Sequence, residues 1–481
     1  MNLKTTNLTM LVDFYELTMA HGYFENGMEN QIAYFDMFFR RVPDEGGFAI
    51  MAGLEQLITY LKNLKFTPED LEYLRQKHLF SEAFLTYLEN FEFACDIYAI
   101  PEGTPIFPNE PILTVRGPII QAQFIETMVL LCINHQSLIA TKANRIVRAA
   151  EGRPVMEFGS RRAQGADGAI LGARASYIGG CIGTACTISD RDFSVPALGT
   201  MAHSWVQTFD TEFEAFKRYA ELYPENCVLL VDTYNTLKQG VPNAIKVFKE
   251  ILIPKGYRPG GIRIDSGDAA YLSKKARKLL DEAGLPDCKI LISNSLDEYI
   301  IKDLLMQKAP IDSFGVGERL ITSKAEPVFG GVYKIVAVEK EGQMIPKIKI
   351  SNNIEKITNP GYKQVFRLFD RNSHKAIADV ITLANEVIDH TKPYTIFDPE
   401  HTWKRKTIEN FYAKPLLMPI FINGKQVYES PDLQDIVDYS KEQIQMLWEE
   451  VLRFEKPHQY YVDLSTDLWN LKTQLLEKYS K

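Results

Sequence analysis

The chain has 481 residues, 46% hydrophobic and 24% charged, a composition typical of ordinary soluble globular proteins with two or three domains. Its formal net charge of -8 at pH 7 argues against a nucleic-acid or anionic-membrane partner, because such partners are normally met by a basic excess. The six cysteines are scattered and form no CxxC pair, which argues against a disulfide framework and a structural zinc site.

No apolar run approaches the length of a membrane span, about 18 residues. Asp13 and Glu16 lie where a signal peptide would be apolar. We therefore expect a cytoplasmic protein with no membrane partner, whose cysteines are mostly buried free thiols.

The first third of the chain predicts part of an α+β domain. Its apolar spacing and its Pro and Gly positions predict a helix over 9–24, a strand covered on both faces over 31–42, helices over 52–90, short strands over 96–118 and one long helix over 119–150. The long helix is apolar to about Ile139 and basic afterwards. We place the first domain boundary within it, so that residues 1–135 form the N-terminal part.

The middle of the chain alternates between short apolar runs and helical segments. The apolar runs end in Gly, hydroxyl or charged residues, at 154–162, 181–186, 227–236, 261–268, 289–295 and 312–317. The helical segments are 162–177, 210–222, 236–253, 269–283 and 296–308. Alternating β and α units with reactive residues at the carboxyl ends of strands are typical of a parallel α/β barrel. Because fewer than eight units are present, we expect an irregular, incomplete barrel over residues 136–330.

The last third returns to β patterns. We expect strands over 332–339, 347–351, 364–369 and 377–383, a Pro-rich passage over 393–431, and helices over 432–455 and 464–479. Residues 331–481 are expected to join the N-terminal part in a second α+β domain formed from both chain ends.

The run Gly261–Asp268 is the most informative strand end. Asp265 and the Ser266 and Gly267 amides follow an apolar strand, and the next helix directs its positive N-terminus to the same point. An anionic substrate held on a metal fits there. A βα turn with an N-capping Asp or Ser explains the same residues when they are taken alone.

Other strand ends offer complementary groups. Phe158 with Arg161 and Arg162 suits a planar anionic ring or a phosphate, although the two arginines alone are typical of a salt-bridged helix start. Asp232 and Asp265 end neighbouring β units and suit a shared hydrated Mg²⁺, although each Asp alone suits a helix cap.

A glycine pair and a histidine complete the candidate site. Gly315 and Gly317 let a backbone approach a phosphate, although a tight turn explains them equally well. His203 follows another apparent strand end. A lone histidine is more often structural, and the barrel context favours a role in the site. Walker-type GxxxxGK[ST], GxGxxG and GxSxG motifs are absent.

With these residues assembled, the chain resembles the nicotinate phosphoribosyltransferases over essentially its full length. The resembling stretches are 13–19, 158–162, 199–204, 231–234, 263–268 and 314–317. The resemblance implies the type II phosphoribosyltransferase fold and a head-to-tail homodimer with active sites at the interface. It also implies an ATP-coupled, ligase-type reaction in NAD salvage, in which nicotinate and 5-phosphoribosyl 1-diphosphate give nicotinate mononucleotide and pyrophosphate.

The resemblance also implies roles for individual residues. Asp232 and Asp265 hold the Mg²⁺-bound pyrophosphate and the ribose hydroxyls, and His203 becomes a phosphohistidine when ATP is hydrolysed. Phe158 stacks on the pyridine ring, with Tyr15 of the partner subunit on its other face. The remaining groups are the anion-binding arginines Arg161, Arg162 and Arg263, the substrate-binding residues Ser266 and Gly267, and the phosphate-cradling residues Ser293, Asn294, Ser295, Gly315 and Gly317.

The chain departs from the family pattern in two places, of which the first bears on the substrate and the second on the phosphate loop. Related nicotinamide enzymes have an Asp at the position of Ala185, where it accepts from the amide NH2, and its absence favours nicotinate because a carboxylate would repel an acid. The segment Ser293–Ser295 is less rich in glycine than in many relatives. The alternatives are a nicotinamide or quinolinate phosphoribosyltransferase, and a catalytically silent nucleotide-binding barrel.

Overall fold

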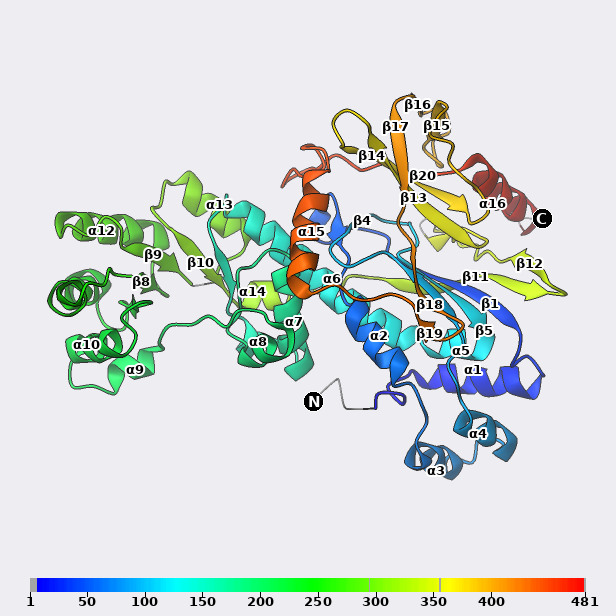
Figure 1. Ribbon diagram of the computed structural model, residues 1–481, viewed down its shortest axis with the longest axis horizontal. Coiled ribbons are helices and arrows are strands. Elements are labelled where there is room, and N and C mark those ends of the chain that lie inside the picture. The colour runs from blue at the N-terminus through cyan, green and yellow to red at the C-terminus, as the bar shows by residue number, and fades with distance from the viewer. Residues whose placement is uncertain (1–6, 294, 354–355, 480–481) are drawn as a thin grey trace. The chain divides into compact units, whose positions relative to one another are not determined.

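The structure is a computed structural model that describes residues 7–293, 295–353 and 356–479 (Figure 1). The chain divides into two compact units, of which the first joins residues 1–138 to residues 328–481 and the second comprises residues 139–327. The helix α6 (Glu126–Ala149) passes from the first unit into the second. The domain limits drawn from the sequence, after residues 135 and 330, lie three residues from these bounds.

Side-chain caps begin several helices of the first unit. Thr67 and Asp70 form a capping box in which each side chain accepts the other's backbone N–H, and Pro68 occupies the first helical position. Ser81 accepts from the Phe84 N–H. The helices are α1 (Phe14–Glu25), α2 (Leu54–Lys62), α3 (Pro68–Gln76), α4 (Glu82–Glu89), α5 (Ile119–Phe124), α15 (Leu433–Gln445) and α16 (Thr466–Tyr479).

An antiparallel seven-stranded sheet in the first unit draws its strands from both parts of the chain. Its order is β12-β11-β1-β5-β3-β18-β19. The strand β1 pairs with β5 on one side and with β11 on the other. It is buried on both faces, which explains why the residues that point to either face are largely apolar. The strands are β1 (Ile32–Phe38), β3 (Asp96–Ala99), β5 (Leu113–Pro118), β11 (Val332–Lys340), β12 (Gln343–Pro346), β18 (Met418–Ile422) and β19 (Lys425–Gln426).

A second, mixed sheet of the first unit has the order β17-β13-β14-β20. Its centre holds a buried ion pair between Arg367 and Asp379, at 2.6 Å. The strands are β13 (Lys363–Asp370), β14 (Ala376–Leu383), β17 (Phe411–Pro415) and β20 (Val462–Leu464), and the two-stranded pairs are β2 (Ala49–Ile50) with β4 (Pro105–Ile106) and β15 (Tyr394–Phe397) with β16 (Arg405–Ile408).

The C-terminal third differs from the sequence prediction in three places. The strand expected over 347–351 is absent, because pairing ends after the Lys347 N–H donates to Val336 O. The Pro-rich passage instead contributes short strands, from β15 to β19. The helix expected to reach residue 455 ends at Gln445, where the Lys375 ammonium donates to the carbonyls of Gln445 and Leu447.

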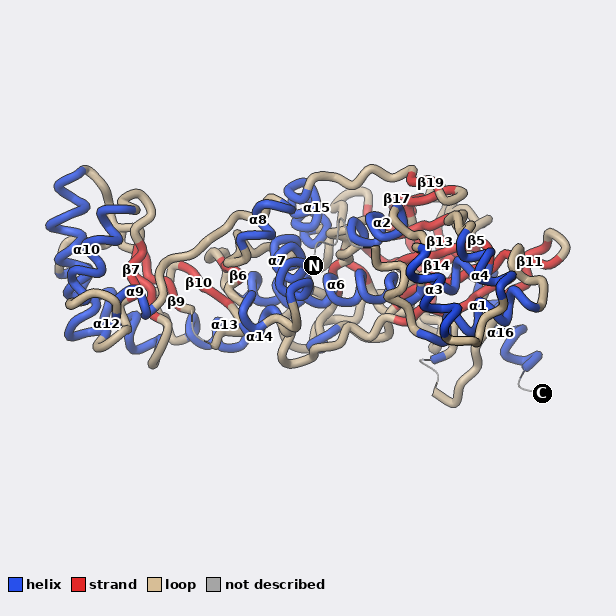
Figure 2. Tube along the Cα trace, turned by 90° about the horizontal axis from the view of Figure 1, so that it is seen from below, coloured by secondary structure: helices blue, strands red, loops and turns tan. Residues whose placement is uncertain are grey.

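The second unit is built on a five-stranded parallel sheet with the order β6-β10-β9-β8-β7 (Figure 2). Beyond β6 the sheet is extended by two isolated parallel bridges. One pairs Glu157 with Thr184, and the other pairs Thr184 with Ala197. The run 181–186 therefore contributes a single bridge residue instead of a full strand. The strands are β6 (Val155–Glu157), β7 (Val228–Leu230), β8 (Gly261–Ile264), β9 (Lys289–Ile292) and β10 (Ser313–Val316).

Helices separate these strands, so all strand carboxyl ends lie at one edge of the sheet. Asp268 and Asp297 cap the helices that follow β8 and β9 by accepting from the N–H groups of Tyr271 and Ile300. The helices are α7 (Ala166–Ile178), α8 (Thr187–Phe193), α9 (His203–Gln207), α10 (Glu212–Leu222), α11 (Val241–Val247), α12 (Ala269–Glu282), α13 (Glu298–Met306) and α14 (Glu318–Ile321). Wider π-helical turns flank α11 at Thr236–Gly240 and Phe248–Leu252.

One helical run in the described part of the chain, Ile119–Ala149, is long enough to cross a membrane. By length and composition it is apolar enough to cross a membrane. However, 67% of its most apolar window is buried inside the protein, which is also typical of a core helix.

All six cysteines are buried and free, as the sequence predicts.

Candidate active site

Arg263 on β8 joins three segments at the carboxyl edge of the parallel sheet. Its guanidinium donates to Ser293 Oγ at 2.7 Å, beyond the end of β9, and to Asp265 Oδ1 at 2.8 Å. It also donates to Thr200 Oγ1 at 3.1 Å and Met201 O at 3.4 Å. Because Ser293 Oγ donates to the same Asp265 oxygen at 2.5 Å, this carboxylate is fixed and partly neutralised.

Asp232 follows the neighbouring strand β7 and is held by the backbone beyond β8. Its Oδ2 accepts from the Asp265 N–H at 3.0 Å and from Ser266 Oγ at 2.5 Å. Its Oδ1 is buried and has no hydrogen-bond partner within the described part of the chain. The two aspartates predicted from the sequence are thus neighbours, and one acceptor atom of Asp232 is available to a ligand.

His203 begins α9 instead of ending a strand, since parallel pairing stops at Ala197. Its Nδ1 lies 3.1 Å from Thr233 Oγ1, and its Nε2 lies 3.9 Å from Asp265 Oδ2. The side chain is 40% exposed. The ring is therefore oriented through one nitrogen and presents the other beside the aspartates.

Phe158 lies against β10 because position 315 has no side chain. A Cβ on Gly315 would be 2.6 Å from a ring carbon of Phe158. The Phe158 N–H donates to Val316 O at 2.7 Å, and the Arg263 guanidinium carbon lies 5.6 Å from the ring centroid. The guanidinium beside the Phe158 ring is thus that of Arg263, whereas the sequence had paired this ring with Arg161 and Arg162.

The residues predicted to bind phosphate lie in different local structures. Ser293 bonds to Asp265 and Arg263, and Ser295 has the left-handed φ of 46°, whereas Asn294 lies outside the described residues. Gly317 is the residue before α14, where an added Cβ would be 3.1 Å from Phe158 O. Gly267 has a φ of 84°, which favours glycine in the turn before α12.

Arg161 and Arg162 are exposed, and Arg162 approaches Glu318 at 3.9 Å. Ala185 is also exposed and donates its N–H to Glu157 O at 2.8 Å. Tyr15 belongs to the other unit. It is 45% exposed, and burial together with the charge of Glu126 raises its pKa well above the ordinary value.

Glu157, the last residue of β6, is not among the site residues predicted from the sequence. Glu157 is fully buried, and its carboxylate accepts from the Gly159 N–H and from Thr184 Oγ, the latter at 2.6 Å. Burial raises its pKa, while these two donors act in the opposite direction. An acidic residue at the buried end of an apolar strand was the signal that could have identified it.

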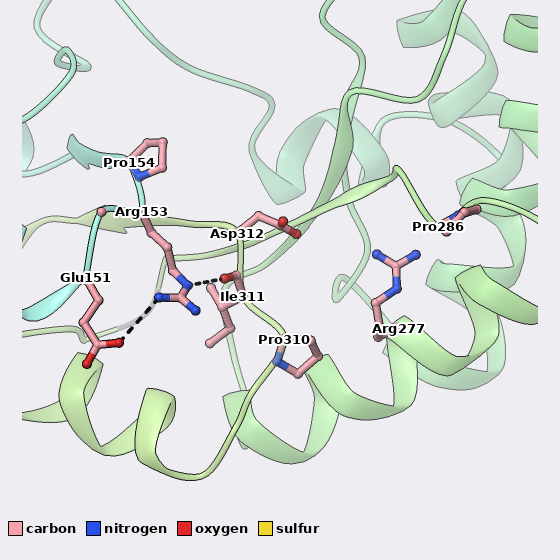
Figure 3. Close-up of a pocket in the computed structure, with 9 residues that line it drawn as sticks. Glu151, Arg153, Pro154, Arg277, Pro286, Pro310, Ile311 and Asp312 are labelled. Carbon is pink, nitrogen blue, oxygen red and sulfur yellow. Dashed lines mark hydrogen bonds and ion pairs between the residues drawn. The ribbon is translucent and has the colours of Figure 1, made fainter.

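A cavity of about 580 Å³ lies at the opposite edge of the parallel sheet, before β6 and β10 (Figure 3). Arg153 donates to Ile311 O there at 2.9 Å and approaches Glu151 at 4.0 Å. Arg277 donates to the carbonyls of Leu285 and Cys288. These cations already have protein partners, and the cavity is separate from the predicted site residues.

The described residues contain no cluster of three or more His, Cys, Asp or Glu side chains that could hold a metal by themselves. The orphaned Oδ1 of Asp232 nevertheless fits a cation that brings its other ligands with it. Mg²⁺ normally keeps waters and substrate phosphates and uses one or two protein carboxylates.

Models of one protein family match almost the whole chain. The nicotinate phosphoribosyltransferase (NAPRTase) N-terminal domain matches residues 10–134, the NAPRTase family region matches residues 154–377 and the C-terminal domain matches residues 362–472. The chain belongs to the nicotinate phosphoribosyltransferase family.

Relatives of known name agree with this membership. A nicotinate phosphoribosyltransferase of Bacillus subtilis is 46% identical over 99% of this chain and 96% of its own length. That of Homo sapiens is 30% identical over 97% of this chain and 96% of its own length. The family resemblance inferred from the sequence motifs is thereby confirmed.

Two solved structures share the fold. The crystal structure of human nicotinic acid phosphoribosyltransferase has a TM-score of 0.83 and 28% identity, covering 97% of this chain and 99% of that one. A nicotinate-nucleotide pyrophosphorylase from Pyrococcus furiosus has a TM-score of 0.70 and 26% identity, covering 92% and 96%. The α/β class predicted for this nicotinate phosphoribosyltransferase family member, with mixed sheets and helices, is confirmed.

Proposed function

We propose that this protein is an enzyme of NAD salvage that joins nicotinate to 5-phosphoribosyl 1-diphosphate, giving nicotinate mononucleotide and pyrophosphate. The continuous network from Phe158 through Arg263 and Asp265 to Asp232 and His203 carries this proposal, within a member of the nicotinate phosphoribosyltransferase family. It places an aromatic face, a guanidinium and two carboxylates at one sheet edge. These groups suit a pyridine acid and a charged sugar phosphate.

The reaction forms a bond between the pyridine nitrogen and ribose C1 while the C1–O bond to pyrophosphate breaks. Positive charge develops on the ribose as the bond breaks, and the carboxylates of Asp265 and Asp232 stabilise it and orient the ribose hydroxyls. The pyridine nitrogen has its own lone pair, so it attacks without a general base. Arg263 helps bind the anionic groups, with Arg161 and Arg162 as further candidates. Ser266, Gly267, Ser293, Ser295 and Gly317 are proposed to bind phosphate oxygens.

Mg²⁺, when bound with the diphosphate, would neutralise the charge that the leaving group gains. Asp232, through its free Oδ1, and Asp265, through Oδ2, are the residues that would hold this complex, partly through water. Because the described residues offer no complete metal cage, we propose that the metal arrives with the substrate.

We further propose that ATP phosphorylates His203. In the tautomer that donates Nδ1–H to Thr233 Oγ1, Nε2 keeps its lone pair for attack on the γ-phosphorus, and ADP leaves with the bonding electrons. Hydrolysis of the N–P bond then returns free histidine and phosphate. This cycle would couple ATP hydrolysis to mononucleotide synthesis.

We infer an incomplete barrel from the spatial order of the strands. Around the sheet, β6, the Thr184 bridge, the Ala197 bridge, β7, β8, β9 and β10 follow chain order, and β10 returns to β6. Among the described residues, no backbone pairing links Ala197 to β7. Side-chain hydrogen bonds from His203 to Thr233 and from Arg263 to Thr200 cross this gap. We also propose that the unit formed from both ends of the chain is the α+β domain that accompanies the barrel.

Ala185 supports nicotinate over nicotinamide as the substrate. Its side chain has no carboxylate to accept from the amide of nicotinamide, and for the same reason it does not repel the carboxylate of nicotinate. Incubation of the protein with the diphosphate donor and, separately, nicotinate, nicotinamide or quinolinate tests it by chromatography of the mononucleotide. We expect nicotinate to give the highest kcat/KM. Faster turnover of nicotinamide or quinolinate would contradict the assignment. Tight nucleotide binding without pyrophosphate release would instead indicate a silent barrel.

A further inference from the structure

Glu157 uses both carboxylate oxygens to tie two loops together. One oxygen accepts from the Gly159 N–H, and the other accepts from Thr184 Oγ at 2.6 Å. Thr184 Oγ in turn accepts from the Cys186 N–H at 2.9 Å. Both side chains are fully buried, so water does not compete for these hydrogen bonds.

The two loops are those that present Phe158 and Ala185. Phe158 lies between Glu157 and Gly159, and Ala185 lies between Thr184 and Cys186. Phe158 and Ala185, the two proposed substrate-binding residues of these loops, are therefore each flanked on both sides by groups of this carboxylate–hydroxyl chain. A shift in these hydrogen bonds would move the aromatic face of Phe158 and the Ala185 loop together.

Sheet pairing alone does not require this acidic side chain. The backbones are already joined, because the Glu157 N–H donates to Gly183 O at 2.9 Å and the Ala185 N–H donates to Glu157 O at 2.8 Å. An apolar residue would fill a buried strand position without the desolvation cost of a carboxylate. The buried acid is consequently explained by what it orients.

We propose that Glu157 and Thr184 are positioning residues that fix the distance between Phe158 and the Ala185 loop and so set the affinity for the pyridine acid. This inference rests on the proposed nicotinate phosphoribosyltransferase activity. Neither residue is expected to govern the diphosphate donor, whose proposed ligands Asp232 and Asp265 are held by other hydrogen bonds.

Thr184→Val tests the proposal by removing the hydroxyl while keeping the side-chain shape. The variant leaves one oxygen of Glu157 and the Cys186 N–H without their partner. We expect the KM for nicotinate to rise about tenfold, the size of one lost hydrogen bond, with kcat within about threefold of wild type. The KM for the diphosphate donor is expected to stay unchanged.

Thr114→Val is the matched control. Thr114 is also fully buried and donates to a buried carboxylate, Asp36 Oδ1, at 2.8 Å, but it belongs to β5 of the first unit and has no proposed substrate contact. We expect this variant to lose thermal stability without a change in either KM. A comparable rise in the nicotinate KM in the control would overturn the assignment to Thr184.

Glu157→Gln provides conservative rescue. Its carbonyl can accept from the Gly159 N–H, and its amide can donate to the second lone pair of Thr184 Oγ1, whose first lone pair accepts from the Cys186 N–H. We expect its nicotinate KM to stay within about threefold of wild type, so a tenfold rise would show that charge, not positioning, is required and would overturn the proposal. Loss of kcat in Thr184→Val with an unchanged nicotinate KM would also overturn it. An inactive wild-type enzyme would instead refute the proposed function itself.

Discussion

Each of the two aspartates at the strand ends has one oxygen engaged by the protein and one directed elsewhere. Asp265 Oδ1 accepts from Arg263 and Ser293, while its Oδ2 faces His203. Asp232 Oδ2 is bound by the backbone of the next strand end, and Oδ1 remains without a partner in the described chain. This division lets the protein fix both carboxylates without neutralising them completely.

Asp265→Asn separates the charge of this residue from its structural contacts. The asparagine carbonyl can still accept from Arg263 and Ser293, so we expect the melting temperature to change by no more than about 3 °C. We expect kcat to fall by about a hundredfold or more, because the charge that stabilises the developing cation is lost. Calorimetry and initial-rate assays check the two parts. A loss of stability that matches the loss of activity would assign Asp265 a structural role.

His203→Ala tests the proposed phosphohistidine. The variant has no nucleophile for the γ-phosphoryl group, so we expect ATP hydrolysis to disappear while slow, ATP-independent mononucleotide synthesis remains. Release of inorganic phosphate and formation of mononucleotide are measured in parallel. Undiminished ATP hydrolysis in the variant would remove His203 from this role.

At the scale of elements, helix α1 joins an exposed aromatic to a buried acid. Tyr15 is exposed, whereas the following residue, Glu16, is fully buried and accepts from Thr127 Oγ1 at 2.7 Å. Burial raises the Glu16 pKa from 4.5 to about 8, with the charges of Glu126 and Asp13 acting in the same direction and the Thr127 hydrogen bond opposing it. The folded protein therefore retains a proton that the unfolded chain releases.

This difference in proton binding predicts a loss of stability as the pH rises from about 4.5 through about 8. Glu16→Gln removes the titration while keeping an acceptor for Thr127. We expect variant and wild type to differ little in melting temperature near pH 5, and the variant to be increasingly the more stable of the two up to pH 8. Scanning calorimetry across this range gives the difference curve. A flat difference curve would contradict the assigned pKa shift.

The strand–helix alternation of the second unit was predictable because each strand ends in residues that cannot continue it. Asp268 and Asp297, for example, mark helix starts through their capping side chains. The C-terminal third was harder, since the alternating residues 347–351 suit a strand but pair with nothing regular among the described residues. Local pattern does not specify a pairing partner.

Some residues of the candidate site could be predicted from the sequence and others could not. Asp232, Asp265, Arg263 and Phe158 were predictable because strand ends of a parallel sheet converge. Glu157 was missed because its importance lies in contacts with Thr184, which is distant in the chain. The position of His203 at a helix start also depends on where the parallel pairing stops.

At the scale of the whole molecule, the family resemblance leads us to propose a homodimer in which Tyr15 completes the neighbouring subunit's site. Mixing Tyr15→Ala with Asp265→Asn, each expected to be nearly inactive alone, tests this arrangement. A hybrid dimer has one site with both residues intact, so random reassociation should restore about a quarter of the wild-type activity. Recovery is measured after dissociation and reassociation of the mixed subunits. No recovery in verified hybrid dimers would place Tyr15 in its own subunit's site or outside the site.

We propose that the protein couples ATP hydrolysis to the synthesis of nicotinate mononucleotide. The most direct measurement is the rate at which the wild-type protein forms the mononucleotide and pyrophosphate from nicotinate and 5-phosphoribosyl 1-diphosphate, with Mg²⁺, in the presence and absence of ATP. We expect one pyrophosphate for each mononucleotide and a rate or yield increased by ATP, with ADP and phosphate released. No mononucleotide under either condition would contradict the proposed activity, and equal rates and yields without ATP hydrolysis would contradict the coupling.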